Sequence, residues 1–167
     1  MNYLKLSLIC LLIVVGLSTK SKADQKYISV KEMECLIEAI YFEARSESFD
    51  GQIAVANVIL NRVSNKKFPR TICEVVHYGH KDWRGLPIRG RCAFSYWCDG
   101  KLEKMNDPVA YQEAINAASL VSEGVEILSI KKALHYHAIY VRPYWASEYK
   151  RLAQIGKHIF YSRERIN

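Results

Sequence analysis

Two neighbouring stretches of the chain carry apolar residues at the spacing of α-helices. The first begins at residues 29–32, Ser-Val-Lys-Glu, a capping box that typically starts a helix. The apolar positions that recur with a helical period after it are Met33, Leu36, Ile37, Ile40, Tyr41 and Ala44. The second stretch, residues 49–63, is apolar nearly all round, which predicts the central buried helix. Its polar exceptions, Asn57 and Asn61, should have hydrogen-bond partners inside the protein.

Two further helices are predicted from their start signals. A Thr-x-x-Glu capping box opens residues 71–76 and predicts a short helix. Asp-Pro at residues 107–108 is typical of a helix start, and this helix should run to about residue 122. Between them, residues 78–91 hold three glycines, one proline and four basic residues. We therefore expect a long surface loop there, and loops of that length are often functional.

The second half of the chain contains the strand signals. Residues 92–98, CAFSYWC, are aromatic and strand-like, and residues 132–141, KALHYHAIYV, alternate well enough to predict a strand that Pro143 ends. A short helix is expected around residues 146–153, followed by a last strand at residues 158–162, HIFYS. The predicted fold class is α+β, a mostly helical single domain with a small antiparallel sheet, and 167 residues suffice for its core.

The N-terminal segment has the layout of a secretory signal peptide. A lysine near the start precedes an apolar run over residues 6–17, and the small-residue pattern Ser-Lys-Ala ends at Ala23. We expect cleavage after Ala23, which leaves residues 24–167 as the mature domain without stable membrane insertion. An uncleaved membrane anchor is the alternative, although the run is shorter than the ~20 apolar residues of a spanning helix.

The mature chain is only mildly basic. Residues 1–23 contain three lysines and no acid, so 21 Lys and Arg remain against 17 Asp and Glu, a net charge of +4. The sequence shows no concentrated basic stripe of the kind that nucleic-acid binders carry, so we expect no nucleic-acid partner. An exported basic protein suits an anionic polymer of the cell envelope, in the periplasm or outside the cell. We expect a monomer.

Four cysteines lie beyond the signal segment, and an even number in an exported chain predicts two disulfides. Three pairings are possible. We favour Cys92–Cys98, which closes a short loop, together with Cys35–Cys73, which would tie two helices together. A metal site is less favoured because no Cys-x-x-Cys spacing occurs.

Glu43 is the first candidate for catalysis. It falls at the border of the apolar stripe of the first helix, near the end of that helix. Partial desolvation there would raise the pKa of its carboxyl, which suits a general acid near neutral pH. The alternative is a solvated charge at a helix end. Glu47 is expected to pair with Arg45 or Arg62, or to help cap the next helix.

Aromatic residues and histidines supply candidates for substrate binding. Aromatic faces stack on sugar rings, so a groove lined by them would suit a polysaccharide. The candidates are Glu47, Trp83, Phe94, Ser95, Tyr96, Trp97, His135, Tyr136, His137 and Trp145. His135 and His137 should face the same side of a strand, where two histidines and an acid could bind zinc, but no HExxH motif occurs. We expect no cofactor.

Several blocks together resemble one family. "CLIEAIYFEARSE", "GQIAVANVILNRV", "FPRTICEVV", "CAFSYWCDGK", "ALHYHAIYVRPYW" and "IGKHIFY" are similar to the bacterial cell wall hydrolase family that includes the spore-cortex-lytic enzymes. The resemblance implies a peptidoglycan-cleaving domain related in fold to lytic transglycosylases and lysozyme-like proteins, with Glu43 as the catalytic acid. The chain departs from the family pattern at Ser46, usually glycine, at Ala93, usually glutamine, and in the placement of the aromatics Tyr96 and Trp97.

The resemblance implies a substrate and a reaction. The glycan strand would be cut between N-acetylmuramic acid and N-acetylglucosamine, by a lytic transglycosylase or a muramidase-type glycoside hydrolase. One candidate acid without a clear second carboxylate favours the transglycosylase. Two alternatives remain, a non-catalytic peptidoglycan-binding domain and a metal-dependent amidase or peptidase that uses His135 and His137.

Overall fold

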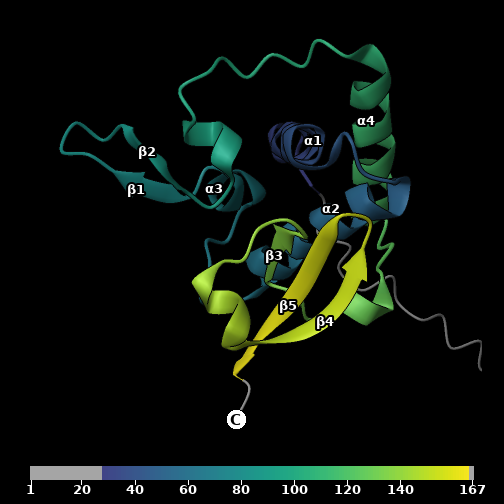
Figure 1. Ribbon diagram of the computed structural model, residues 1–167. Coiled ribbons are helices and arrows are strands. Elements are labelled where there is room, and N and C mark those ends of the chain that lie inside the picture. Colours follow the sequence, from purple (N-terminus) through teal and green to yellow (C-terminus); the bar gives the residue numbers. More distant parts are fainter. Residues whose placement is uncertain (1–27, 166–167) are drawn as a thin grey trace, which may run out of the picture.

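The computed structural model describes residues 28–165, so the predicted signal peptide lies outside the described residues. Figure 1 shows a helical body with a three-stranded sheet beside it and a two-stranded hairpin that projects from it. In chain order the elements are α1 (Val30–Ala44), α2 (Phe49–Ser64), α3 (Ile72–Val76), β1 (Gly79–Lys81), β2 (Pro87–Cys92), η1 (Ser95–Cys98), α4 (Pro108–Ser122), η2 (Leu128–Ile130), β3 (His135–Ala138), η3 (Tyr144–Ser147), β4 (Tyr149–Ile155) and β5 (His158–Arg165). Within the described range, no helix is both long and apolar enough to cross a membrane.

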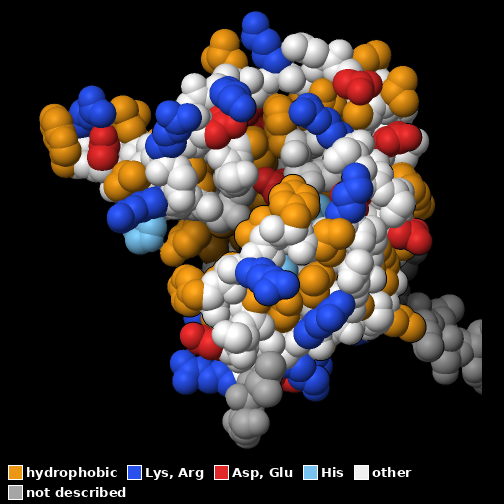
Figure 2. Space-filling model, viewed as in Figure 1, with side chains coloured by type: hydrophobic (Ala, Val, Ile, Leu, Met, Phe, Trp, Pro, Cys, Tyr) orange, Lys and Arg blue, Asp and Glu red, His pale blue; other side chains and the backbone are white. Residues whose placement is uncertain are grey.

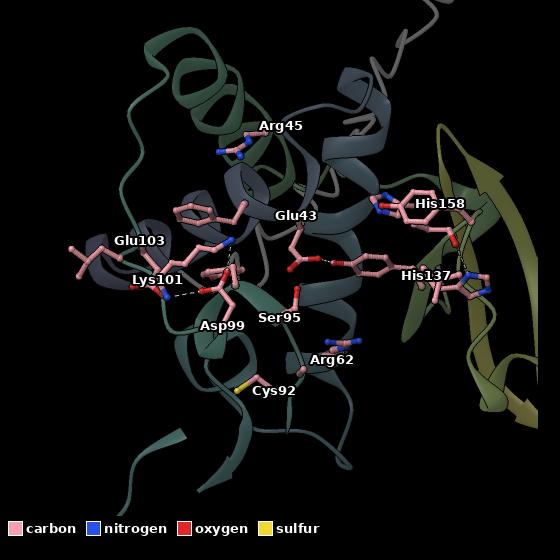
Figure 3. A pocket seen from close by; sticks show the side chains of 18 residues that line it. Glu43, Arg45, Arg62, Cys92, Ser95, Asp99, Lys101, Glu103, His137 and His158 are labelled. Carbon is pink, nitrogen blue, oxygen red and sulfur yellow. Dashed lines mark hydrogen bonds and ion pairs between the residues drawn. The ribbon is translucent and has the colours of Figure 1, made fainter. Parts of the chain in front are cut away.

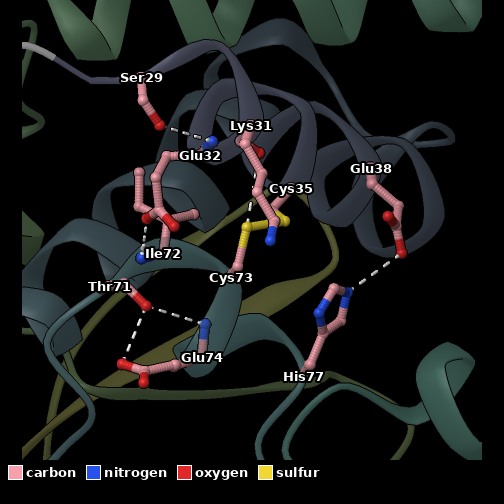
Figure 4. Close-up of a disulfide and its surroundings, with 10 residues drawn as sticks. All are labelled: Ser29, Lys31, Glu32, Cys35, Glu38, Thr71, Ile72, Cys73, Glu74 and His77. Carbon is pink, nitrogen blue, oxygen red and sulfur yellow. Dashed lines mark hydrogen bonds and ion pairs between the residues drawn. A yellow bond between two sulfur atoms is a disulfide. The ribbon is translucent and has the colours of Figure 1, made fainter.

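The start of α1 is fastened to α3 (Figure 4). The Ser29 hydroxyl caps α1 by accepting the Glu32 backbone N–H at 3.3 Å, as the capping box predicts. The Glu32 carboxylate accepts from the backbone N–H of Ile72, the first residue of α3. A disulfide between Cys35 and Cys73 joins the same two helices. These contacts fix the direction in which α1 runs towards Glu43.

Helix α2 is the buried centre of the protein, as its composition predicts. Its polar residues do have internal partners: Asn57 donates to the Val125 carbonyl at 3.0 Å and accepts from the Ile127 N–H at 2.8 Å. Asn61 donates to the Ala133 carbonyl at 3.0 Å. Because these bonds reach the segment that leads into β3, α2 positions the sheet as well as the core.

Helix α4 packs against both α1 and α2 through small side chains. It begins as predicted, with the Asp107 carboxylate accepting from the second and third residues of the helix and with proline at its first position. The buried residues on its inner face are Ala110, Ala114, Ala117, Ala118 and Val121. Small residues allow the helix axes to approach closely, which closes the core on this side.

The three-stranded sheet is antiparallel in the order β3-β5-β4. Its central strand, β5, was predicted, and Phe160 on it packs with Ala54 and Val58 of α2 in a second buried cluster. Strand β3 pairs with β5 so that Tyr136 lies opposite Phe160. The sheet therefore holds Tyr136 against the helical body.

Two predictions for residues 78–98 were wrong. Residues 78–91 form the β1–β2 hairpin rather than a loop, because the backbone of Asp82 pairs with that of Leu86 and closes a tight turn. Residues 92–98 contain the 3-10 helix η1 rather than a strand. The buried residues of this segment, Phe94 just before η1 and Tyr96 and Cys98 within it, alternate as they would in a strand, so the period-two pattern was misleading.

The region after Pro143 also differs from its prediction. Only Tyr144–Ser147 is helical, as a single 3-10 turn, and Tyr149–Ile155 is strand β4 where a short helix was expected. Pairing with β5 determines this outcome, because Tyr149–Ile155 lies antiparallel along that strand and pairs with it at five positions, with two irregularities in the register. Strand β3 covers only His135–Ala138, which is shorter than the predicted run.

Candidate active site

A cavity of about 720 Å³ opens between the end of α1, the η1 segment and strands β3 and β5 (Figure 3). Its described lining residues are Phe42, Glu43, Arg45, Arg62, Cys92, Ala93, Ser95, Tyr96, Asp99, Lys101, Leu102, Glu103, Tyr136, His137, Ala138, Tyr140, Val141 and His158. Polar and aromatic groups thus line a space large enough for sugar rings.

Glu43 projects into this cavity from the last turn of α1, one residue before the helix ends. The Tyr136 hydroxyl, which comes from β3, donates a hydrogen bond to Glu43 Oε2 at 3.1 Å. Because α1 is fixed by the core and Tyr136 by the sheet, the carboxyl is held between two rigid elements. The carboxyl group lines the cavity, so a ligand bound there can reach it.

The surroundings of Glu43 favour its protonated form. Desolvation by burial is the largest effect and raises the pKa of this carboxyl above its ordinary value, although the side chain keeps partial exposure to the cavity. Smaller opposing effects come from the Tyr136 hydroxyl, the Arg62 charge and the backbone amide of Ser95. A carboxyl with a raised pKa can hold a proton close to neutral pH and release it to a substrate oxygen.

Arg62 supplies a fixed positive charge beneath Glu43. Its side chain is only 7% exposed, and its Nε donates to the Leu134 carbonyl at 2.8 Å. The guanidinium lies 5.1 Å from the Phe94 ring centroid and 5.5 Å from that of Phe68. Such a buried cation stabilises the carboxylate form of Glu43 after the proton has left. Arg62 was predicted only as a possible partner of Glu47, and its place beside Glu43 was not predicted.

The opposite side of the cavity carries further charges that the sequence analysis also missed. Asp99 and Glu103 line it together with Lys101, whose Nζ lies 3.7 Å from Asp99 Oδ2. In Figure 3 this group lies across the cavity from His137 and His158. Asp99, Lys101 and Glu103 come to the same cavity as Glu43 only in the folded chain, and no local sequence motif predicts this.

Four of the residues predicted to bind substrate line the cavity with Glu43: Ser95, Tyr96, Tyr136 and His137. The His137 ring contacts the Tyr161 hydroxyl through Nε2 at 3.0 Å, which fixes its orientation. Ala93, at one of the departures from the family pattern, also lines the cavity. A short side chain there widens the space beside η1.

The other predicted substrate residues are not among the described residues that line the cavity. Glu47 accepts the Lys157 backbone N–H at 2.7 Å, so it joins α2's start to the β4–β5 turn. Phe94 is 1% exposed and lies beneath the Arg62 guanidinium. The Trp97 ring stacks on His77 with centroids 3.7 Å apart. These three side chains thus contact other parts of the protein rather than the cavity.

His135 and Trp145 also pack outside the cavity lining. The His135 ring lies 4.9 Å from Tyr149 and 5.4 Å from Trp145, and burial lowers its pKa to about 4, so it is neutral at physiological pH. Among residues 28–165, no group of three His, Cys, Asp or Glu side chains could hold a metal ion. Trp83, the last predicted aromatic, lies at the tip of the hairpin with 92% of its surface exposed.

Residues 46–161 match the protein family described as Cell Wall Hydrolase. The chain belongs to this family. Over 132 residues it is 27% identical to the spore cortex-lytic enzyme of Bacillus subtilis, covering 79% of this chain and 38% of that protein. Over 135 residues it is 31% identical to the spore cortex-lytic enzyme of Oceanobacillus iheyensis, covering 79% and 42% respectively. The chain therefore spans less than half the length of these curated relatives.

Solved structures show the same fold as this member of the cell wall hydrolase family. The catalytic domain of the Bacillus cereus SleB protein is 28% identical, with a TM-score of 0.59 over 82% of this chain and 94% of that one. The catalytic domain of the germination-specific lytic transglycosylase SleB from Bacillus anthracis is also 28% identical, with a TM-score of 0.61 over 83% and 99%. These similarities confirm the α+β single-domain fold. Glu43 lies three residues before the family match begins.

Proposed function

We propose that this protein is a lytic transglycosylase that cleaves the glycan strand of peptidoglycan, with Glu43 as its general acid and base. The family and the names of the similar solved domains support the substrate and the reaction class. The single observation that carries the assignment of Glu43 is its position: a carboxyl of raised pKa, held by the Tyr136 hydroxyl, at the wall of the cavity.

In the first step, protonated Glu43 donates its proton to the oxygen between N-acetylmuramic acid and N-acetylglucosamine. The bond from the muramyl anomeric carbon to that oxygen breaks, and an oxocarbenium-like sugar forms. The carboxylate that remains is stabilised by the Tyr136 hydrogen bond and by the Arg62 charge. The same two groups thus favour the product side of the proton transfer.

In the second step, the 6-hydroxyl of the muramyl sugar attacks its own anomeric carbon. The proton of that hydroxyl returns to the Glu43 carboxylate, which restores the protonated acid. The products are a free N-acetylglucosamine hydroxyl and a 1,6-anhydromuramyl end, and no water is consumed. One carboxyl group suffices for both proton transfers, so this reaction needs no second carboxylate.

One observation favours a second candidate, a muramidase-type hydrolase. Asp99 and Glu103 line the same cavity as Glu43, and hydrolysis uses a second carboxylate as nucleophile or as base for water. The ion pair with Lys101, at 3.7 Å, helps to orient the Asp99 side chain. Under this mechanism Asp99→Asn would abolish activity, whereas a transglycosylase would retain turnover.

We also propose that residues 1–23 are a signal peptide and that the mature domain acts in the cell envelope, in the periplasm or outside the cell, as a monomer. The apolar run followed by small residues supports export. The two disulfides agree with an oxidising compartment.

Release of soluble fragments from purified peptidoglycan by residues 24–167 tests the role of Glu43. Glu43→Gln keeps the shape of the side chain but cannot donate a proton, so release should fall at least about a thousandfold, within the range that general acid catalysis contributes. Glu47→Gln is the matched control, because its amide oxygen can still accept from Lys157. Equal activity of Glu43→Gln and the wild type would refute the assignment.

A further inference from the structure

The β1–β2 hairpin concentrates charge and aromatic surface outside the cavity. It contains one acidic residue, Asp82, and four basic residues, so residues 78–92 have a net charge of +3. The basic residues are Lys81, Arg84, Arg89 and Arg91. The whole described range, residues 28–165, has 20 Lys and Arg against 16 Asp and Glu, a net charge of +4. Most of the net positive charge of this domain therefore lies on one projecting hairpin, which forms the protrusion at the left of Figure 2.

Exposed apolar side chains lie among these charges. Trp83 is 92% exposed at the tip, Leu86 is 52% exposed beside it, and Tyr78 is 58% exposed at the base. A tryptophan side chain that contributes so little to the core is available for a partner. Arg89 and Arg91 are both exposed on β2, on either side of Gly90.

The tip of the hairpin is rigidly built. Asp82 Oδ1 accepts from the backbone N–H groups of Arg84 and Leu86 at 2.9 and 3.0 Å, and Asp82 Oδ2 accepts from the Arg84 guanidinium. Gly85 has φ +80°, a conformation that favours glycine and lets the chain turn back. The Arg84 guanidinium lies 5.6 Å from the Trp83 ring centroid. An isolated two-stranded hairpin is only marginally stable in water, so it depends on such contacts at its turn. Here these contacts set the position of the exposed Trp83 side chain.

The base of the hairpin is part of the active-site wall. Cys92, the last residue of β2, lines the cavity, as does Ala93 beside it, and the Ala93 N–H donates to the Tyr78 carbonyl at 2.8 Å. The Cys92–Cys98 disulfide joins β2 to η1, which contributes Ser95 to the cavity. The hairpin therefore begins at the wall of the cavity.

We propose that the β1–β2 hairpin is a second peptidoglycan-binding surface, which takes the strand where it extends beyond the cavity; this rests on the proposed substrate. Trp83 stacks on a sugar ring. Arg89, Arg91 and Lys81 pair with the carboxylates of the acidic stem peptides. An anionic membrane surface suits the hairpin less well, because Asp82 would bring a negative charge to the end that enters the lipid.

Binding to insoluble peptidoglycan in a Glu43→Gln background tests the hairpin separately from cleavage. Arg89→Gln combined with Arg91→Gln should weaken binding about threefold to tenfold, as expected for two exposed ion pairs. Lys66→Gln combined with Lys67→Gln, two exposed lysines in the turn after α2, is the matched control for charge and should bind like the parent. Sedimentation of protein with washed peptidoglycan at low salt measures the affinity.

The aromatic contribution has its own variant and control. Trp83→Ala should weaken binding about tenfold, which is typical of an exposed tryptophan that becomes buried in a complex. Tyr144→Ala, which removes another aromatic side chain that is 84% exposed, should not change it. Conversion of the peptidoglycan carboxylates to amides should abolish the effect of the arginine pair and leave the effect of Trp83→Ala. Thermal unfolding of each variant checks that the hairpin remains folded.

Two outcomes would overturn the proposal. In one, the hairpin variants bind intact peptidoglycan as tightly as the parent. In the other, they lose binding to phosphatidylglycerol vesicles while peptidoglycan binding is unchanged, which would identify a membrane surface instead. Neither outcome bears on the proposed function, which is tested separately by whether Glu43→Gln stops the release of fragments.

Discussion

The hydrogen bond between Tyr136 and Glu43 can be tested by removing a single oxygen atom. Tyr136→Phe deletes the hydroxyl that donates to Glu43 Oε2 at 3.1 Å, while the ring keeps its packing against Phe160. A hydrogen bond to a charged acceptor contributes about 1.5–3 kcal/mol. One pKa unit corresponds to about 1.4 kcal/mol, and Glu43 is partly exposed, so we expect its pKa to rise by about one unit.

The sign of the expected effect follows from the protonation state that the first step needs. Tyr136 favours the carboxylate, so its loss raises the pKa of Glu43, and the protonated acid persists to higher pH. The alkaline limb of kcat/KM against pH should move upwards by about one unit, and the maximal rate should fall about tenfold to a hundredfold because the carboxyl is less well positioned.

A matched variant separates this effect from the general loss of a hydroxyl. Tyr161→Phe removes a hydroxyl that contacts His137 rather than Glu43. Its pH profile should keep the alkaline limb of the wild type. An unchanged or lowered limb in Tyr136→Phe would refute the reasoning that this hydroxyl stabilises the Glu43 carboxylate.

Three further predictions concern stability. Burial raises the folded-state pKa of Glu43 above its unfolded value, so Glu43→Gln should raise the thermal midpoint at pH 7, and the gain should disappear below about pH 4, where both states are protonated. Asn57→Ala removes two hydrogen bonds, to the Val125 carbonyl and from the Ile127 N–H, and should cost about 1–3 kcal/mol in urea unfolding. Replacing Cys35 and Cys73 by alanine releases a chain crosslink with a sequence separation of 38 and should cost about 4 kcal/mol in the same assay.

Signals that lie within a few residues of each other predicted the structure well. The capping residues Ser29 and Asp107 mark the true starts of α1 and α4, because the cap and the first turn interact directly. A short helix was predicted in error around residues 146–153, since strand β4 (Tyr149–Ile155) forms only against β5. A hydrogen-bond ladder between distant segments leaves little trace in local sequence.

The candidate site divides in the same way. Glu43 could be proposed from its place at the edge of an apolar helix face, and Tyr136 from its aromatic surroundings. Arg62, Asp99 and Glu103 could not, because they reach the cavity from segments that meet only in the folded chain. A single arginine in the second predicted helix, which is apolar nearly all round, was the one sequence signal for Arg62, but it did not show that this side chain lies near Glu43.

The most direct test of the central claim is the chemistry of the new sugar ends. Digestion of purified peptidoglycan in water labelled with heavy oxygen, followed by mass spectrometry of the soluble fragments, distinguishes the two reactions. If Glu43 acts alone as acid and base, the fragments should end in unlabelled 1,6-anhydromuramic acid and should be absent with Glu43→Gln. Reducing ends that carry the heavy oxygen would contradict the transglycosylase mechanism and would point to hydrolysis with Asp99 or Glu103 as the second carboxylate.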